Sequence, residues 1–210
     1  MDPRRVSPRR LMVQPSMMEQ QVIDSFNQSI EAKMNAGEGL VYPIVGSASL
    51  IVEALLSGNR IFSCGNGLSS TLASTLSYLL LNQFRIERPG FAALCLSTDS
   101  VLNTGLSQQT NFTEIFSRQL RALSHGGDIL VTFSTNHNAS NLVQAIQTAH
   151  DREMTVIAFT GPGDNNVSAL LTGEDIEVRV EAQDPYRIQE IQLLSLFTLC
   201  ELIESQLFGG

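Results

Sequence analysis

The chain has 210 residues, of which 43% are hydrophobic, and it carries a formal net charge of −8 at pH 7. This length predicts one or at most two domains with a sizeable hydrophobic core. The acidic balance argues against broad binding to the phosphate backbone of nucleic acids, so no direct contact with DNA is expected. A membrane partner is not expected either, because no apolar stretch reaches the roughly 18 residues that a span requires.

The first 16 residues differ in composition from the rest of the chain. Four arginines and three prolines stand there against one aspartate, a local charge of +3 that leaves −11 for the remainder. With little hydrophobic periodicity, residues 1–16 are predicted to be a disordered arm. Two alternatives stay open, a basic arm that touches nucleic acid and a translated leader with the natural start at Met17 or Met18. Residues 17–210 are predicted to form a single domain.

The three cysteines, Cys64, Cys95 and Cys200, are far apart in the sequence, and each lies in an apolar run. This distribution predicts reduced thiols in the core of a cytoplasmic protein, with neither a disulfide framework nor the spacing of a metal site. No metal and no other cofactor is therefore expected.

Two amphipathic helices are predicted before the first strand. The first covers residues 17–35, where apolar residues recur at helical spacing, and Gly37 and Gly39 are expected to end it. The second covers residues 41–56, with Pro43 in its first turn, where a missing N–H does no harm. An apolar helix hairpin of this kind, outside the main repeat of strands and helices, suggests packing on a second copy of the chain.

The most informative stretch is residues 60–84. A short apolar run at 61–64 predicts a buried strand, Gly65-Asn66-Gly67 predicts a tight turn, and 69–84 predicts a helix. Ser69 and Ser70 suit the N-cap of that helix. Such a turn can hold a phosphate at the positive end of the helix dipole, although a tight turn that binds nothing is the alternative.

Strands and helices alternate through the rest of the chain. Strands are predicted at 91–96, 128–133, 155–159 and 176–180, and helices at 111–123, 139–151, 167–171 and 185–208, with a helical or irregular patch after Asp99. This alternation predicts an α/β fold, a doubly wound five-stranded parallel sheet of the flavodoxin-like kind, with an N-terminal helix hairpin and a long C-terminal helix.

Two polar loops should meet at the carboxyl ends of these strands, where ligands bind in such sheets. Both loops lead into helices and are rich in hydroxyl and amide side chains, without Lys or Arg, which predicts a neutral cup for a phosphate or a sugar. Two capped helices with nothing bound are the alternative. The candidate ligand-binding residues of the loops are Gly65, Asn66, Gly67, Ser69, Ser134, Thr135 and Asn136.

Five short motifs carry a resemblance to a known family. They are CGNG at 64–67, ERPG at 87–90, GDILVTFST at 127–135, FTG at 159–161 and RIQE at 187–190. Together they resemble the SIS (sugar isomerase) domain family, in the branch that contains sedoheptulose-7-phosphate isomerases and DnaA initiator-associating (DiaA) proteins. The resemblance covers about residues 18–208 and implies a SIS fold and a homotetramer.

The resemblance also implies which residues an isomerase of this branch needs. Its metal and acid/base set comprises a His and a Glu one turn apart after CGNG, the Gln of RIQE, and a His eight residues later. These positions hold Thr75, Leu79, Gln189 and Phe197 here. Leucine and phenylalanine neither titrate nor bind zinc, so no catalytic and no metal-binding residue is predicted. Gln189 is kept as a candidate sugar ligand.

The C-terminal pair Leu207 and Phe208 matches, in type and place, a Leu-Phe pair that contacts the initiator DnaA in DiaA-like proteins. The sequence is therefore interpreted as a pseudoenzyme, a homotetramer that binds DnaA during initiation of DNA replication. Two other functions stay open: a phosphosugar isomerase acting on sedoheptulose 7-phosphate, and a sensor that binds a sugar phosphate without reaction. The pair could also fold back against the chain's own helices.

Overall fold

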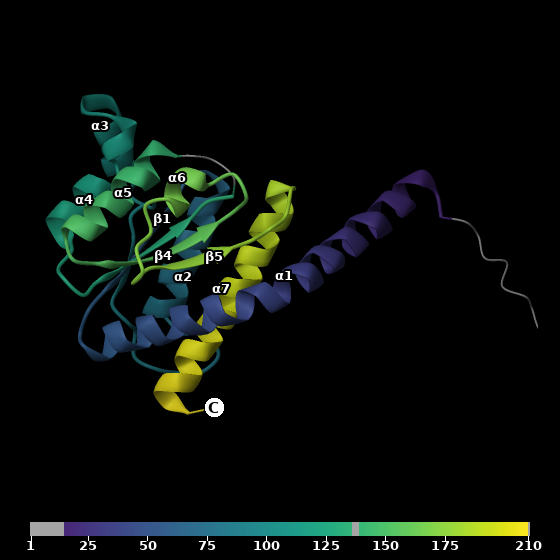
Figure 1. The fold of residues 1–210 in the computed structure, drawn as a ribbon, viewed down its shortest axis with the longest axis horizontal. Coiled ribbons are helices and arrows are strands. Elements are labelled where there is room, and N and C mark those ends of the chain that lie inside the picture. Colours follow the sequence, from purple (N-terminus) through teal and green to yellow (C-terminus); the bar gives the residue numbers. More distant parts are fainter. Residues whose placement is uncertain (1–14, 136–138, 210) are drawn as a thin grey trace, which may run out of the picture.

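The computed structural model describes residues 15–135 and 139–209. Its helices are α1 (Met17–Leu56), α2 (Leu68–Leu81), α3 (Ser100–Gln109), the 3₁₀ turn η1 (Phe112–Glu114), α4 (Ser117–Leu123), α5 (Ser140–Asp151), α6 (Asn165–Ser168) and α7 (Pro185–Phe208). Its strands are β1 (Ile61–Gly65), β2 (Ala93–Cys95), β3 (Ile129–Phe133), β4 (Thr155–Thr160) and β5 (Ile176–Arg179). Figure 1 shows the sheet between layers of helices, with α1 reaching far beyond the body of the molecule.

The strands form one parallel sheet in the order β2-β1-β3-β4-β5. This is the flavodoxin-like order, in which the chain reverses its direction across the sheet between β1 and β3. The predicted doubly wound five-stranded sheet is confirmed. The region after Asp99 is helical, with the Asp99 side chain accepting from the N–H of Leu102 at 2.8 Å, and the predicted helix at 111–123 is divided into η1 and α4.

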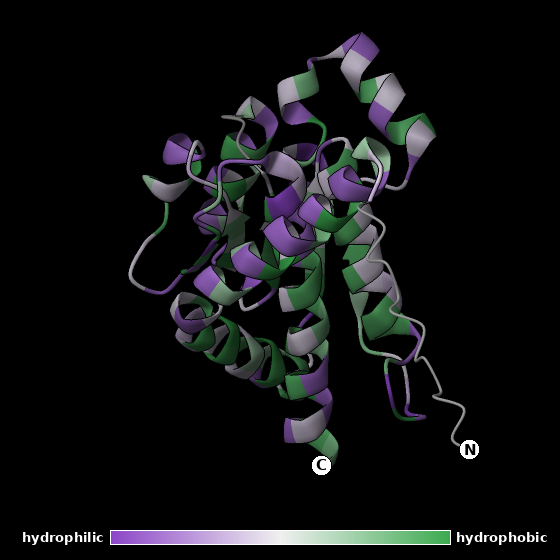
Figure 2. Cartoon of the chain, turned by 90° about the vertical axis from the view of Figure 1, so that its right-hand side faces the viewer, coloured by the Kyte–Doolittle hydropathy of each residue, from purple (hydrophilic) through white to green (hydrophobic). Residues whose placement is uncertain are grey.

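The three central strands, β1, β3 and β4, each contribute to two hydrophobic cores, because successive side chains of a strand point to opposite faces. Ile61, Val131 and Phe159 belong to the core that the sheet shares with α1, α2 and α7. Phe62 and Leu130 belong to the second core, which is completed by residues of α4 and α5. Figure 2 shows hydrophobic residues recurring along the helices, with hydrophilic ones between them, as this layered packing requires.

The predicted N-terminal hairpin is wrong, since α1 is one continuous helix of 40 residues. Gly37, Gly39 and Pro43 lie inside it. Glycine in a helix costs only about 1 kcal/mol relative to alanine, and packing can offset that cost. Leu40 and Ile51, on either side of Pro43, are buried in the core against the sheet and α7, which holds the helix together through the proline.

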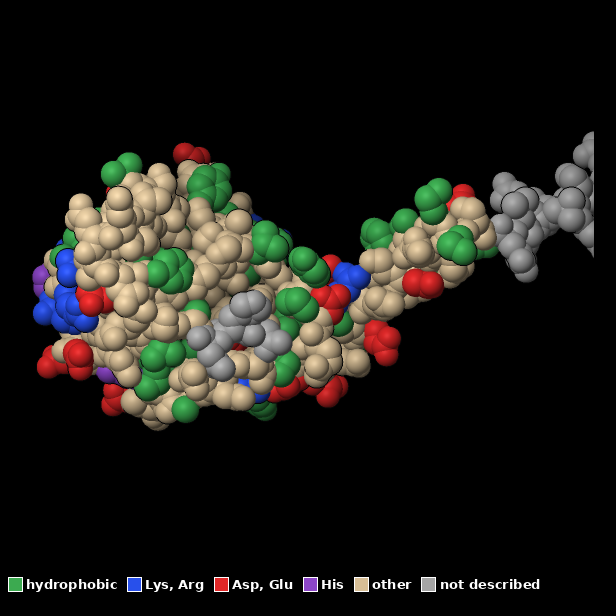
Figure 3. Space-filling model, turned by 90° about the horizontal axis from the view of Figure 1, so that it is seen from above, with side chains coloured by type: hydrophobic (Ala, Val, Ile, Leu, Met, Phe, Trp, Pro, Cys, Tyr) green, Lys and Arg blue, Asp and Glu red, His purple; other side chains and the backbone are tan. Residues whose placement is uncertain are grey.

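The first half of α1 projects from the body and carries large exposed apolar side chains (Figure 3). Its start is well defined, because Ser16 and Glu19 form a reciprocal capping box. Five apolar residues recur at every fourth position and therefore form one continuous ridge, which winds slowly around the helix. They are between 56% and 75% exposed: Met18, Val22, Phe26, Ile30 and Met34. We call these five residues the α1 stripe.

Polar contacts join the end of this projecting half to the start of α7. The Lys33 amine donates to Ser29 Oγ at 2.5 Å and to Glu190 Oε2 at 3.3 Å. Glu190 also accepts from Ser29 and from Arg187. Burial alone would raise the pKa of Glu190, but the hydrogen bonds from Ser29 and Lys33 and the charge of Arg187 lower it below its usual value.

A buried ion pair closes the opposite end of the molecule. Arg88 and Glu204 are 2% and 5% exposed, and their side chains meet at 2.8 Å. Glu204 also accepts from the backbone N–H groups of Phe84 and Arg85, at 3.0 and 2.9 Å. Burial alone would raise the pKa of Glu204, but these hydrogen bonds and the charge of Arg88 lower it. We call this group the Arg88–Glu204 cluster.

Arg88 is held by more than its carboxylate partner. Its guanidinium donates to the carbonyls of Leu79 and Leu80 at 2.8 and 3.0 Å, at the C-terminal end of α2. It also lies over the ring of Phe91, 4.0 Å from the centroid. The arginine of the ERPG motif therefore ends α2 and ties it to α7.

The cysteines are free and buried, as predicted. Burial raises the pKa of the Cys64 thiol, and it raises the pKa of the Cys200 thiol to about 12. Both thiols are protonated at neutral pH.

Two helices, α1 and α7, each contain an 18-residue window long and apolar enough to cross a membrane by length and composition alone. The sequence analysis expected no apolar stretch of this length, and these two windows correct that expectation. These windows are 33% and 44% buried inside the structure, and core helices pass the same test, so the finding is weak evidence for a span.

Candidate functional site

A pocket of about 540 Å³ lies at the carboxyl ends of β1 and β3, where the sheet order reverses. Ligands of doubly wound sheets bind at this reversal point. Three segments form its walls: the β1–α2 turn, the segment after β3, and the start of α7. The described lining residues are Asn66, Gly67, Leu68, Ser69, Phe112, Phe133, Ser134, Thr135, Ala139, Leu142, Pro185, Tyr186 and Gln189.

The first wall depends on two glycines. A Cβ on Gly65 would lie 2.7 Å from the backbone carbonyl of Ser69, which is closer than real Cβ contacts, and a tight 3.1 Å from the carbonyl oxygen of Phe133. Gly67 has a φ of +53°, in the left-handed region that favours glycine. Only glycine therefore lets the turn pass this close to β3 and enter α2.

The expected serine cap of α2 is wrong. Gly67 is the N-cap, and no side chain accepts a hydrogen bond from the first turn. The Ser70 hydroxyl donates to the carbonyl of Gly67 at 2.6 Å instead. The positive end of α2 therefore faces the pocket without a side-chain acceptor of its own, a suitable place for an anion.

The Asn66 side chain is turned toward α5. Its Nδ2 donates to Asn141 Oδ1 at 2.8 Å, and Asn141 Nδ2 donates to Asn66 Oδ1 at 2.8 Å. Asn141 is fully buried. The amide group expected to contact a ligand is therefore engaged with a residue that sequence reasoning missed.

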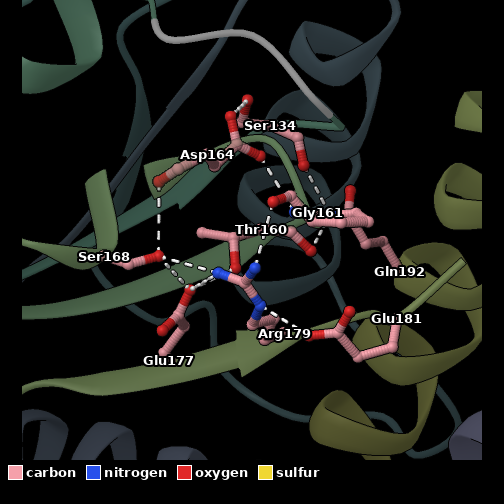
Figure 4. Close-up of polar contacts among 10 residues, drawn as sticks. Ser134, Thr160, Gly161, Asp164, Ser168, Glu177, Arg179, Glu181 and Gln192 are labelled. Atoms are coloured by element: carbon pink, nitrogen blue, oxygen red, sulfur yellow. Dashed lines mark hydrogen bonds and ion pairs between the residues drawn. The ribbon is translucent and has the colours of Figure 1, made fainter. Parts of the chain in front are cut away.

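The second wall is held from behind by buried polar groups (Figure 4). Ser134 Oγ donates to Asp164 Oδ1 at 2.7 Å, and the Ser134 carbonyl accepts from Gln192 Nε2 at 2.7 Å. The second oxygen of Asp164 accepts from the N–H of Gly161 at 2.9 Å. Thr135 lines the pocket beside Ser134. Asn136, the remaining predicted ligand residue of this loop, lies outside the described residues.

The loop that carries Asp164 is in turn fixed by β5. Arg179 donates to the carbonyl of Pro162 and to Ser168 Oγ, both at 3.1 Å, and Glu177 accepts from Ser168 Oγ at 2.6 Å (Figure 4). The hydrogen bond to Glu181 is the main cause that raises the pKa of Arg179. The charge of Arg179 is therefore balanced by the carboxylates of Glu177 and Glu181.

The start of α7 forms the third wall. Asp184 accepts from the N–H of Tyr186 at 2.8 Å and caps the helix, with Pro185 at its first position. Gln189 Nε2 donates to the carbonyl of Leu68 at 2.8 Å, so this predicted ligand residue contacts the first turn of α2. The Tyr186 side chain is 66% exposed at the pocket. Among the described lining residues none is Asp, Glu, Lys, Arg or His, so the pocket is formally neutral.

The residues present do not fit the metal that the isomerase resemblance implies. Gln189 lines the pocket, whereas Thr75, Leu79 and Phe197 are not among its described lining residues. The Thr75 hydroxyl donates to the Thr71 carbonyl at 2.7 Å, Leu79 packs against the main core, and Phe197 stacks on Phe84 at 6.0 Å. No group of three or more His, Cys, Asp or Glu that could hold a metal occurs in the described part of the chain.

The predicted partner-binding pair has contacts within the chain. Leu207 packs against the main core, and Phe208 stacks on Phe91 with 6.2 Å between ring centroids. Phe208 remains 47% exposed.

Sequence reasoning missed several residues that build the site, among them Phe112, Asn141, Asp164 and Tyr186. Asp164 had a usable signal, because it follows Gly161-Pro162-Gly163 directly after a predicted strand. Asn141 had none, since one asparagine in the first turn of a helix is an ordinary surface residue.

The sheet order and the pocket define a flavodoxin-like α/β protein with a ligand pocket between β1 and β3. A family model described as the SIS domain matches residues 25–161. The chain belongs to the SIS domain family.

Several curated relatives are named phosphoheptose isomerase. The phosphoheptose isomerase of Chromohalobacter salexigens is 43% identical over 192 residues, which cover 91% of this chain and 98% of that protein. The phosphoheptose isomerase of Shewanella sp. (strain ANA-3) is 41% identical over 191 residues, covering 91% and 97%. The solved phosphoheptose isomerase from Francisella tularensis has a TM-score of 0.87 at 33% identity, covering 90% of this chain and all of that one.

These findings overturn the interpretation of the chain as a non-enzymatic pseudoenzyme that binds DnaA. Relatives that are 40–43% identical over 91% of the chain carry the name of an enzyme. The interpretation gave three replaced positions and two C-terminal residues more weight than a similarity along nearly the whole chain. The packing of Leu207 and Phe208 within the chain also supplies a structural reason for an apolar C-terminal end.

Proposed function

We propose that the pocket binds a phosphorylated sugar and that the protein interconverts the ketose and aldose forms of a heptose phosphate, with sedoheptulose 7-phosphate as the first substrate to test. The observation that carries the proposal is a hydroxyl-lined pocket at the uncapped N-terminus of α2, in a chain similar to phosphoheptose isomerases along 91% of its length. We further propose that residues 17–210 form a single SIS domain and that the protein acts in the cytoplasm.

The phosphate would lie at the N-terminus of α2. The helix dipole and the hydroxyl groups of Ser69, Ser134 and Thr135 would stabilise its charge. No lysine or arginine is among the described lining residues, so this site should bind a dianion more weakly than one with an arginine clamp. The sugar would extend toward Phe112 and Tyr186.

Isomerisation moves a proton between adjacent carbons and needs an acid or base beside the substrate. Tyr186 has the one ionisable side chain among the described lining residues. We therefore assign it as the first acid/base candidate. The donor set of the described lining residues does not fit a metal.

The test uses purified protein, sedoheptulose 7-phosphate, turnover followed by NMR, and binding followed by calorimetry. We expect wild-type turnover, and a large loss of kcat with little change in KM for Tyr186→Phe. Tyr78→Phe is the matched control, because Tyr78 is 60% exposed on α2 and is not among the described lining residues. Binding without turnover would favour the sugar-phosphate sensor, and the absence of both would overturn the proposal.

We also infer that copies of the chain associate through α1, with a homotetramer as the form that the resemblance implies. The α1 stripe is exposed, and it leads to an apolar groove of about 360 Å³ between α1 and α7. Lying side by side, two such helices would bury both stripes. Light scattering should show an oligomer that Phe26→Ser dissociates, while Leu56→Ser, 74% exposed outside the stripe, leaves it intact. A monomeric wild type would contradict this.

A further inference from the structure

The reciprocal amide pair of Asn66 and Asn141 joins helices that lie on opposite faces of the sheet. Asn66 lies in the turn that opens α2, and α2 packs into the core with α1 and α7. Asn141 is the second residue of α5, which packs into the other core. The pair therefore crosses the carboxyl edge of the sheet at the reversal point between β1 and β3, beside the pocket.

We propose that Asn66 and Asn141 are a positioning pair that fixes the first turn of α2 relative to α5 and thereby sets the phosphate-binding end of the pocket. This inference rests on the proposed function. Neither side chain needs to touch the ligand for it to hold.

The chemistry of the pair explains the choice of two amides. Each amide donates one hydrogen bond and accepts one, both at 2.8 Å, so the two side chains satisfy each other only in one relative orientation. A carboxylate at either position would place two acceptors against each other. An apolar side chain would leave the partner amide without its bonds in a region where Asn141 is fully buried.

The position of Asn66 controls the start of α2 directly. The N–H of Ser69 donates to the carbonyl of Asn66 at 3.0 Å, and the N–H of Ser70 donates to that of Gly67 at 3.1 Å. A shift of Asn66 would therefore move the first turn of α2, whose residues Leu68 and Ser69 line the pocket. Gln189 supports the same turn through the carbonyl of Leu68, from α7.

The fold itself does not require the pair. The parallel register of β1 and β3 continues to Gly65 and Phe133, the residue just before Asn66 and its partner in the sheet. Both helices are also anchored in their own cores. Loss of the pair should thus weaken ligand binding more than a comparable hydrogen-bond loss elsewhere.

The experiment measures the affinity of the full chain for inorganic phosphate and for sedoheptulose 7-phosphate, with thermal stability recorded for each variant. We expect Asn66→Ala and Asn141→Ala each to weaken both affinities at least tenfold. The double variant should be no weaker than either single one, because each substitution already removes the whole pair. In turnover, KM should rise and kcat should change by less than threefold.

Asn103→Ala is the matched control. Asn103 also makes two side-chain hydrogen bonds, to the carbonyl of Leu96 and from Gln119, both at 3.2 Å, but it is not among the described lining residues. The Asn103→Ala variant should lose about as much stability as the Asn66 and Asn141 variants, and its affinities for both probes should stay within twofold of the wild type.

The possible results distinguish failure of the positioning role from failure of the proposed function. If wild-type protein binds phosphate and the pair variants match Asn103→Ala, or the double variant is far weaker than the singles, the positioning role is wrong. If wild-type protein binds neither probe, the proposed function fails and this inference fails with it. Should Asn141→Ala not fold, the half-buried Asn66→Ala and the isosteric Asn141→Asp make the same comparison.

Discussion

The two ends of α2 show opposite uses of buried polar groups. At its C-terminal end, the carbonyls of Leu79 and Leu80 accept from Arg88, and Glu204 balances the charge of that arginine. At its N-terminal end no side chain caps the helix, and the first turn faces a pocket of about 540 Å³. A helix end whose groups are satisfied within the chain serves stability, whereas one left without a side-chain cap can bind a ligand.

The polar groups near the pocket follow the same logic. Asn66 with Asn141, and Ser134 with Asp164, satisfy each other behind the lining and hold it in place. They fix the geometry while leaving the end of α2 available. Substitutions at the two ends should therefore separate stability from ligand binding.

The largest expected effect is at the closed end. Glu204→Ala leaves Arg88 buried without its partner, which should lower the free energy of unfolding by about 3–5 kcal/mol. Denaturant unfolding measures this, with Glu201→Ala as control, because the Arg85–Glu201 pair is exposed. A loss below about 1 kcal/mol would show that the Arg88–Glu204 cluster contributes little to stability.

The next effect is at the open end. Gly65→Ala places a Cβ 2.7 Å from the Ser69 backbone and should cost about 1–3 kcal/mol of stability, with loss of sugar-phosphate affinity as the turn shifts. Gly105→Ala in α3 is the control, because a Cβ added there would have nothing within 4 Å and alanine favours a helix. Calorimetry and thermal unfolding together would show whether affinity responds more than stability does.

A smaller effect should appear with pH. The pKa values of Glu204 and Glu190 are lowered in the folded chain, so the unfolded chain binds more protons as these groups titrate. The stability that these two carboxylates contribute should therefore be fully present and independent of pH near neutrality, and it should be lost as the pH falls below about 4.3, the ordinary pKa of glutamate. Glu190→Gln should reduce the slope of that fall. If the free energy of unfolding of this variant falls with pH as steeply as that of the wild type, Glu190 does not contribute to the acid sensitivity.

The smallest effect should be on the surface. Arg118 and Glu114 pair at 3.0 Å while 49% and 34% exposed. Arg118→Ala should change the free energy of unfolding by no more than about 0.5 kcal/mol and leave ligand binding unchanged. It sets the baseline against which the two ends of α2 are judged.

Hydrophobic patterning predicted the sheet and its helices well, because buried parallel strands are short apolar runs between polar turns. It failed in α1, where Gly37, Gly39 and Pro43 carry strong local signals for a break. Burial of Leu40 and Ile51 outweighs those signals, and such packing between distant segments is not visible in a local window.

The sequence indicated where a candidate site would lie but not the contacts that build it. Gly67, Ser134 and Thr135 line the pocket, and the signal for them was that glycines and hydroxyls follow predicted strands. The assignment of Ser69 as a cap, and the partners Asn141 and Asp164, depend on how two loops approach across the edge of the sheet. The approach of the two loops depends on tertiary packing, which no single position of the sequence reveals.

The scarcity of one residue type has a practical consequence. Lys33 is the chain's single lysine, and its amine lies between Ser29 and Glu190 where the projecting half of α1 meets α7. An amine-reactive fluorophore thus has one side-chain target, at the junction between the projecting helix and the body. Labelling yield and dye mobility there would follow the docking of that helix in real time, without any engineered cysteine.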